Sequence, residues 1–209
     1  MTPTIAALYI DPRGCYAGLE GVELWDEKRD ARLYPGPWPV VAHPPCQRWG
    51  RYWSGGPSAK VRRELGDDGG CFAAAITAVR CWGGVLEHPE ASHAWRAHGL
   101  LPPMKCGGWV AAGDMLGWTC CVEQGHYGHR ARKATWLYAV GVELLSLAWG
   151  PATGKARLDP GYHSAAERAR GGRTCAGRLT ARENLATPPA FRDVLIAMAR
   201  SVYKRTVAA

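Results

Sequence analysis

Residues 39–47 read Pro39-Val40-Val41-Ala42-His43-Pro44-Pro45-Cys46-Gln47. The apolar run Val40–Ala42 is typical of a short buried strand, and it ends at two prolines, which cannot donate hydrogen bonds to a sheet. Cys46 is therefore expected on the connection just beyond the strand. In an α/β sheet that position, outside the carboxyl end of a strand, is where ligands bind. A thiol on such a turn is a candidate nucleophile, and a buried structural cysteine is the alternative.

Length and composition favour one domain with a small appendage. The chain has 209 residues, of which 47% are hydrophobic, which suffices for a substantial core. Lys and Arg outnumber Asp and Glu by 26 to 18, which gives a net charge of +8. This balance suits a polyanionic partner such as nucleic acid, although basic proteins without such a partner also occur.

Cysteine usage favours a cytoplasmic protein without a metal site. The first residues lack the charged and apolar regions of a signal peptide, so the eight cysteines are expected to be free thiols. No C-x-x-C pair occurs, and His88, His93 and His98 recur every five residues, which scatters them around a helix. No apolar run approaches the length that spans a membrane, so no membrane partner is expected.

Hydrophobic patterns predict an α/β fold. Besides the run before Cys46, strands are expected at residues 5–10, 22–25, 85–88, 118–123 and 135–140, with the last two forming a hairpin. Helices are expected at residues 71–82, 90–98 and 190–203. Thr180 and Glu183 have the spacing of a capping box.

The first two predicted strands have the order of a nucleotide-cofactor half-site. Asp11 ends the first strand, a glycine-containing turn with Gly14 follows, and Asp26 and Glu27 come directly after the second strand. In such half-sites a terminal acid binds a ribose. The glycines lack G-x-G spacing, and ordinary turns explain them equally well.

The segment after Cys46 has the composition of a nucleic-acid contact. Basic, aromatic and glycine residues alternate over residues 48–60, and aromatic rings there can stack on bases. Packing in the core is the alternative for the tryptophans. The candidate contacts in this segment are Gln47, Arg48, Trp49, Arg51 and Trp53.

In its order of motifs, the chain resembles an abridged DNA (cytosine-5) methyltransferase. Pro44-Pro45-Cys46-Gln47 is similar to the nucleophile motif of that family, and Leu86-Glu87-His88 lies where the family has Glu-Asn-Val. Tyr127-Gly128 followed by Arg130, Arg132 and Lys133 is similar to the stretch that contains Gln-x-Arg-x-Arg. Arg178-Leu179-Thr180-Ala181-Arg182-Glu183 resembles Arg-x-Leu-Thr-x-Arg-Glu, and the last predicted helix matches the closing helix of the family.

Several positions depart from the family pattern. Asp11-Pro12-Arg13-Gly14 stands where the family has its Phe-x-Gly-x-Gly cofactor loop. Counted from Tyr127-Gly128, Ala131 replaces the motif glutamine, and Lys133 and Thr135 occupy the two arginine positions. His88 replaces the asparagine that follows the motif glutamate.

The resemblance implies a methyltransferase-like, Rossmann-type mixed sheet, truncated at the cofactor end. It implies a catalytic core over residues 1–141, a small basic target-recognition-like insertion over 142–177 and a C-terminal helical part over 178–209. A compact relative of this kind fits a phage or prophage setting.

The resemblance further implies a DNA cytosine-5 modifying enzyme, a methyltransferase, that acts on a flipped base. Cys46 would add to C6 of cytosine, Glu87 would act as a carboxylic acid at N3, and Lys133 or Arg132 would hold the carbonyl side. S-adenosylmethionine would be the methyl donor. Its candidate contacts are Asp11, Gly14, Asp26, Glu27 and Pro44. Further candidate contacts to DNA are Arg130, Arg178 and Arg182.

Two other functions remain open. The same thiol chemistry serves one-carbon transfer to a pyrimidine nucleotide with a different donor, because thymidylate synthases also place a Pro-Cys nucleophile against C6. A non-catalytic DNA-binding relative that shields or senses sites is the second alternative.

Overall fold

A seven-stranded sheet is the centre of the computed structural model, which describes residues 4–55, 60–154, 156, 158, 169 and 179–207, without the side chains of 203–207. The strands lie in the order β2-β1-β3-β4-β7-β6-β5. Their bounds are β1 Ile5–Leu8, β2 Val22–Trp25, β3 Val40–Ala42, β4 Gly84–Pro89, β5 Val110–Ala111, β6 Trp118–Glu123 and β7 Ala134–Val140. The predicted α/β class with a mixed sheet is confirmed.

Strand direction changes within the sheet at β7. β2, β1, β3 and β4 pair in parallel, whereas β7 runs antiparallel to both β4 and β6. The predicted hairpin of residues 118–123 and 135–140 is thus present as β6 and β7. β1 has β2 on one side and β3 on the other, which makes a topological switch point, and ligands of open α/β sheets bind outside the carboxyl ends of strands at such a point.

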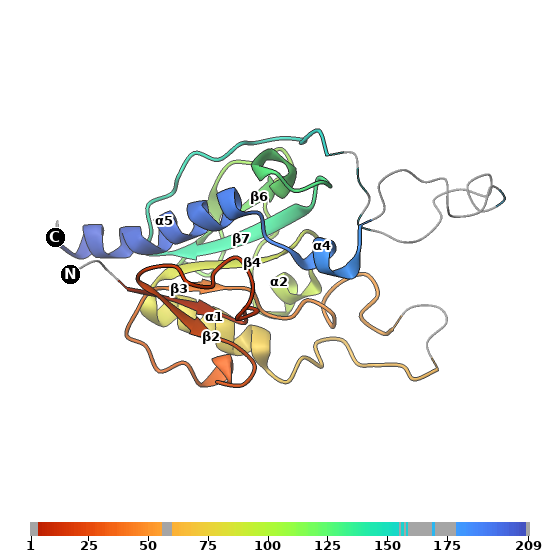
Figure 1. Ribbon diagram of the computed structural model, residues 1–209, viewed down its shortest axis with the longest axis horizontal. Coiled ribbons are helices and arrows are strands. Elements are labelled where there is room, and N and C mark those ends of the chain that lie inside the picture. The colour runs from red at the N-terminus through yellow and green to blue at the C-terminus, as the bar shows by residue number, and fades with distance from the viewer. Residues whose placement is uncertain are drawn as a thin grey trace.

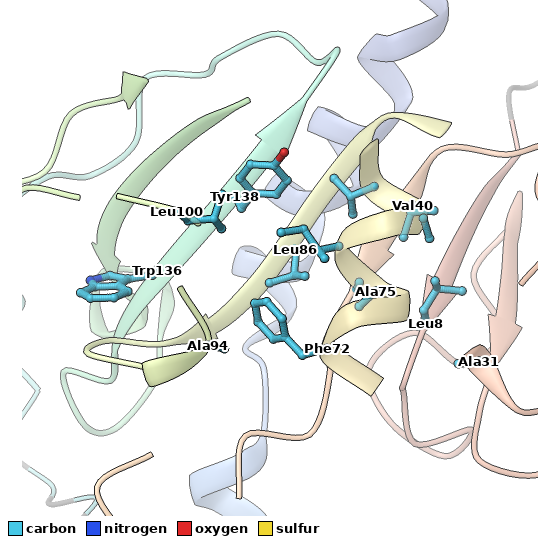
Figure 2. Close-up of a cluster of buried hydrophobic side chains, with 14 of the residues drawn as sticks. Leu8, Ala31, Val40, Phe72, Ala75, Leu86, Ala94, Leu100, Trp136 and Tyr138 are labelled. Carbon is cyan, nitrogen blue, oxygen red and sulfur yellow. The ribbon is translucent and has the colours of Figure 1, made fainter. Parts of the chain in front are cut away.

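Two long helices cover opposite faces of the sheet, as Figure 1 shows with α1 in yellow and α5 in blue. Successive side chains of a strand point to opposite faces, so each buried strand contributes to two clusters. One cluster joins Leu8, Val40 and Leu86 to Phe72 of α1 (Cys71–Trp82), as Figure 2 shows. The other joins the alternate strand residues to the apolar side of α5 (Pro189–Val207). The predicted helices at both places are confirmed.

Several short elements differ from expectation. The predicted helix at 90–98 shortens to α2 (His93–Ala97), because Ala91 has a φ of 59° and Ser92 caps the helix by accepting from the Ala94 N–H. The first strand ends at Leu8, because Tyr9 has a φ of 60° and leaves the extended conformation. The sequence did not predict β5, η1 (Ala31–Leu33) or η2 (Gln124–Tyr127).

The C-terminal part of the chain returns to the sheet. The capping box is confirmed: Thr180 and Glu183 cap α4 (Ala181–Leu185) reciprocally. Val142 and Leu147, at the start of the proposed insertion, are buried in the same cluster as α5, whereas most of residues 155–178 lie outside the described residues. No helix within the described ranges is long and apolar enough to cross a membrane.

Candidate active site at the carboxyl ends of β3 and β4

The pairing of β3 with β4 brings two polar side chains together. Ala42 lies opposite Leu86 in the parallel ladder, and both side chains point into the cluster on the α1 face. The next residues, His43 and Glu87, therefore point to the other face. Nδ1 of His43 lies 3.0 Å from Oε2 of Glu87. The buried strands thus place an imidazole and a carboxylate in contact at the sheet's carboxyl edge.

Cys46 lies on the loop that follows β3, as the sequence predicts. Its carbonyl oxygen accepts hydrogen bonds from the backbone N–H groups of Trp49, at 3.0 Å, and Gly50, at 3.1 Å, which closes a tight turn. Pro44, two residues earlier, is buried, and the Cys46 side chain is partly buried. Burial, together with the negative charge of Glu87, raises the pKa of the Cys46 thiol, whereas the charge of Lys133 lowers it. Cys46 and Glu87 therefore lie within electrostatic reach of each other.

Glu87 is a buried carboxylate with a partner on each oxygen. Oε1 accepts from Nε2 of Gln124 at 2.8 Å, and Oε2 contacts His43. Burial by itself would raise the pKa of Glu87, but the hydrogen bond and charge of His43 outweigh it and lower this pKa to about 2. Glu87 is thus an ionised acceptor at neutral pH and not the carboxylic acid that the sequence led us to expect at N3.

Three further residues complete a hydrogen-bond chain that the sequence did not reveal. The hydroxyl of Tyr16 lies 2.8 Å from Nε2 of His43, and Nε2 of Gln124 also lies 3.0 Å from Oγ1 of Thr135. His43 and Gln124 each follow a strand directly, and a polar residue at such a position is a usable signal. Tyr16 lies in a glycine-rich connection, and no sequence pattern distinguishes it.

The two basic candidates beside Glu87 have different surroundings. Nζ of Lys133 donates to the carbonyl oxygen of Ala186 at 2.8 Å, and burial lowers the pKa of Lys133, while the charges of Glu87 and Cys46 oppose that effect. Arg132 instead forms an ion pair with Glu123 through two hydrogen bonds. Lys133 therefore fits the expected role at the site better than Arg132.

His88 departs from the family asparagine and is part of the core. Only 1% of its surface is exposed, and its ring packs against Phe72 and Trp95. Burial lowers the pKa of His88 to about 4, so the ring is neutral at physiological pH.

The predicted cofactor half-site has an acid but no open glycine loop. The backbone N–H of Gly14 donates to the carbonyl oxygen of Asp11 at 2.8 Å, and the N–H of Arg13 donates to Oδ1 of Asp11 at 2.9 Å. The turn therefore uses its own donors. Oδ1 of Asp26 likewise accepts from the N–H of Arg29 at 3.0 Å, while Glu27 is exposed. All residues between β1 and β2 are described, and they form turns rather than a helix.

The segment after Cys46 divides into core and surface residues. Trp49 packs in the core, only 6% exposed, where its Nε1 donates to Oδ2 of Asp68 at 2.7 Å, so it does not present its ring to a nucleic acid. Arg48 donates to the carbonyl oxygen of Trp53 at 3.1 Å. Gln47 and Arg51 are exposed and Trp53 is partly exposed, as a contact surface requires.

The predicted DNA contacts near the C-terminus lie on the surface or outside the described part. Arg130 forms an ion pair with Glu183, and its side chain is largely exposed. Arg182 is exposed on α4. Arg178 lies outside the described residues.

Among the described residues, no three His, Cys, Asp or Glu side chains form a group that could hold a metal ion. The cysteines in this part of the chain are all free. Compared with protein-family models, curated proteins and solved structures, the chain matches none of them.

Proposed function

We propose that this protein is a DNA cytosine-5 modifying enzyme in which Cys46 adds to C6 of a flipped cytosine. The observation that carries the proposal is the grouping of Cys46, Glu87 and Lys133 at the carboxyl edge of β3 and β4, where the charges of Glu87 and Lys133 act on each other and on the Cys46 thiol. The motif order of the sequence and the mixed sheet with its antiparallel β7 support the same assignment.

The addition step balances with the groups at this site. The Cys46 thiol loses its proton, and the thiolate forms a bond to C6 while the C5–C6 π bond breaks. The electron pair moves through C5 and C4 to N3, which takes up a proton. Glu87 accepts from that N3–H and from the amino group at C4, and Lys133 stabilises the charge on the carbonyl side. One proton leaves sulfur and one arrives at N3, so the step needs no external acid.

Addition at C6 makes C5 nucleophilic, which prepares it for transfer of a one-carbon group. When C5 has taken up that group, loss of the C5 proton to a base re-forms the C5–C6 double bond and expels the Cys46 thiolate. N3 then returns its proton. The cytosine has to leave the DNA stack for this chemistry.

S-adenosylmethionine is the methyl donor that the family resemblance implies, and its fit to this chain is poor. The Asp11–Gly14 turn is closed by its own hydrogen bonds, and no helix lies between β1 and β2, a stretch that the structure describes in full. Only the acid after β2, Asp26, has the expected place. We therefore derive no step through this donor.

Exchange of the C5 hydrogen tests the proposed function without any donor. A C6 adduct labilises that hydrogen, so duplex DNA with tritium at cytosine C5 should release tritium to water in the presence of the protein. Cys46→Ser should abolish the release, because an alcohol does not ionise at neutral pH as a thiol can. Cys81→Ser, at an exposed cysteine in α1, is the matched control and should release tritium like the wild type.

The outcomes separate the three functions. Release from duplex DNA alone supports the proposal, whereas release from the free nucleotide alone selects pyrimidine-nucleotide chemistry. No release from either substrate, with DNA binding intact, selects the non-catalytic DNA-binding relative, which the closed Asp11–Gly14 turn also favours.

Calorimetry tests the donor separately. A binding isotherm with millimolar S-adenosylmethionine that the double variant Asp26→Ala, Glu27→Ala lacks would assign this donor despite the closed Asp11–Gly14 turn. If the wild type gives no heat of binding, the donor assignment is wrong even where tritium release is observed.

A further inference from the structure

A chain of partly or fully buried hydrogen bonds lies beside the proposed nucleophile and links four loops or strand ends. Tyr16 follows β1, His43 follows β3, Glu87 lies in β4 and Gln124 follows β6. The distances are 2.8 Å from the Tyr16 hydroxyl to His43, 3.0 Å from His43 to Glu87 and 2.8 Å from Gln124 to Glu87. The addition chemistry described above uses Glu87 but assigns nothing to Tyr16 or His43.

The partners determine where the hydrogens lie. An ionised carboxylate only accepts, so Nδ1 of His43 carries the hydrogen that faces Glu87. Burial raises the pKa of Tyr16 well above its ordinary value, so its hydroxyl keeps its hydrogen. The Tyr16 hydroxyl lies 2.8 Å from Nε2 of His43 and donates to it in the tautomer that carries its hydrogen on Nδ1. Every polar hydrogen along this line has an acceptor.

The position of Tyr16 makes this arrangement rigid. Only 3% of Tyr16 is exposed, and its ring packs against His43 with 5.5 Å between the ring centroids. It belongs to the apolar cluster that includes the α5 residues Phe191 and Leu195. The core therefore fixes the hydroxyl, and the hydroxyl fixes the tautomer and the direction of the imidazole.

We propose that His43, fixed by Tyr16, is a positioning residue: it holds Oε2 of Glu87, beside Gln124 on Oε1, so that the carboxylate stays a hydrogen-bond acceptor for the base that Cys46 attacks. The identity of that base rests on the proposed function. Acceptor oxygens suit a pyrimidine that presents an amino group at C4, and they repel one that presents a carbonyl oxygen there.

The other charged and titratable groups near Glu87 do not take over the role of His43 in keeping Glu87 ionised. Lys133 acts on Glu87 through its charge, while its Nζ donates to backbone carbonyls at the end of α4. His88, on the same strand, is neutral and packs among aromatic rings on the other side of the sheet. Cys46 adds a negative charge when it ionises and so favours a protonated Glu87. Without His43, burial is therefore expected to dominate and to raise the pKa of Glu87.

Carbon-13 NMR of the protein labelled at glutamate Cδ tests the inference directly, with the Glu87 signal assigned from the spectrum of Glu87→Gln. In the wild type the carboxylate signal should stay ionised down to pH 4. In His43→Phe the titration midpoint should rise by about two pH units or more, because burial then acts without its opposing partner. His43→Asn, whose amide N–H can take the place of the Nδ1 donor, should restore much of the difference.

Tyr16→Phe provides a second test in case the His43 variants do not fold. It removes one hydroxyl and keeps the packed ring. It should raise the Glu87 midpoint by about half a pH unit or more, with an unchanged melting temperature at neutral pH as evidence of an intact fold. The inference is overturned when the Glu87 midpoint of Tyr16→Phe and of each folded His43 variant stays within a few tenths of a unit of the wild type.

This readout does not depend on activity. If the His43 and Tyr16 variants shift the titration of Glu87 as expected but no substrate releases tritium, the positioning role of His43 is established and the proposed function is wrong. If Tyr16→Phe changes neither tritium release at any pH nor the titration of Glu87, the positioning role is wrong and the proposed function stands.

Discussion

The ammonium group of Lys133 lies 2.8 Å from the carbonyl oxygen of Ala186, which joins the turn before β7 to the segment that follows α4. This contact holds a positive charge in a partly buried place beside Cys46 and Glu87. The C-terminal segment thereby helps to position a charge of the site through its backbone.

The charge of Lys133 should set the reactivity of the Cys46 thiol. Lys133→Met removes the neighbour that lowers the pKa of Cys46, so the thiolate fraction falls and alkylation by iodoacetamide at pH 8 slows by about threefold or more. Lys133→Arg keeps the charge and should react nearly like the wild type. Lys105→Met, at an exposed lysine that pairs with Glu90, is the control for loss of any lysine. An unchanged rate in Lys133→Met would show that the ammonium does not act on the thiol.

Glu87→Gln should accelerate the alkylation of Cys46, whereas Lys133→Met slows it. The negative charge of Glu87 raises the pKa of Cys46, so its removal lowers that pKa and accelerates alkylation at pH 8. The same variant should nevertheless release C5 tritium more slowly by about a hundredfold, because N3 loses its carboxylate partner. Opposite effects on alkylation and on exchange are the signature of this arrangement, and a parallel loss of both would indicate a damaged fold.

Stability should depend on pH through Glu87. The pKa of Glu87 is about 2 in the folded protein against 4.5 as its ordinary value, so the group stabilises the fold above pH 4.5 and this stabilisation is lost as the pH falls toward 2. The full effect corresponds to roughly 3 kcal/mol as an upper bound. Urea unfolding of the wild type at a series of pH values measures it.

The matched comparison is Glu87→Gln, whose free energy of unfolding should fall less steeply between pH 5 and pH 2. Glu143→Gln, at an exposed glutamate, should keep the wild-type slope. Equal slopes for all three proteins would contradict the low pKa of Glu87.

All strands except β5, and the position of Cys46, were predictable because local patterns determine them. Val40–Ala42 is uniformly apolar and ends at two prolines, so both the strand and the loop that carries Cys46 follow from composition alone. The helix over residues 71–82 has the bounds that the sequence predicts, because helical spacing and the glycine pair after it agree.

The contacts of the site were not predictable, because they depend on strand order. His43 meets Glu87 only since β3 lies beside β4 in parallel register, and the two residues are 44 positions apart in the sequence. Tyr16 reaches His43 from a third strand end, and Trp49 turns inward although its neighbours are basic.

Proximity in the sequence also groups Arg132 with Lys133, which the structure separates. Adjacent side chains on a turn point in different directions, so the two cations have different neighbours. Glu123 pairs with Arg132, whereas Lys133 lies against the carbonyl oxygens at the end of α4. Which of two neighbouring cations serves a site is therefore decided by the surrounding elements and not by the local pattern.

DNA binding by the proposed enzyme should fall steeply with salt. Arg51, Arg62 and Arg63 are exposed and offer charges to phosphates. Replacing all three by Ala should weaken binding at low salt and reduce the slope of log K against log[salt] by about 0.9 for each phosphate that is no longer neutralised. Lys105→Ala is the control, because its charge is offset by Glu90 at 3.3 Å. Binding that is absent at low salt, or that ignores salt, would remove DNA as the partner.

The register of β3 against β4 should be the most sensitive feature of the site. Gly84 lies opposite Val40 with a φ of 123°, and a Cβ at this glycine would lie 2.0 Å from the Val40 carbonyl oxygen. Gly84→Ala therefore forces the two strands apart and should lower the free energy of unfolding by about 2–4 kcal/mol. Where Gly84→Ala still folds, the His43–Glu87 contact should open, and the Glu87 carboxyl signal should titrate at higher pH than in the wild type.

Gly18→Ala is the control that measures the cost of a positive φ without a steric clash. Gly18 has a φ of 71°, but an added Cβ would meet nothing within 4 Å, so this substitution should cost only about 1 kcal/mol. It should also leave the titration of Glu87 unchanged, because Gly18 lies outside the paired strands. A Gly84→Ala protein as stable as Gly18→Ala, with an unmoved Glu87 signal, would mean that the strand register does not determine the geometry of the site.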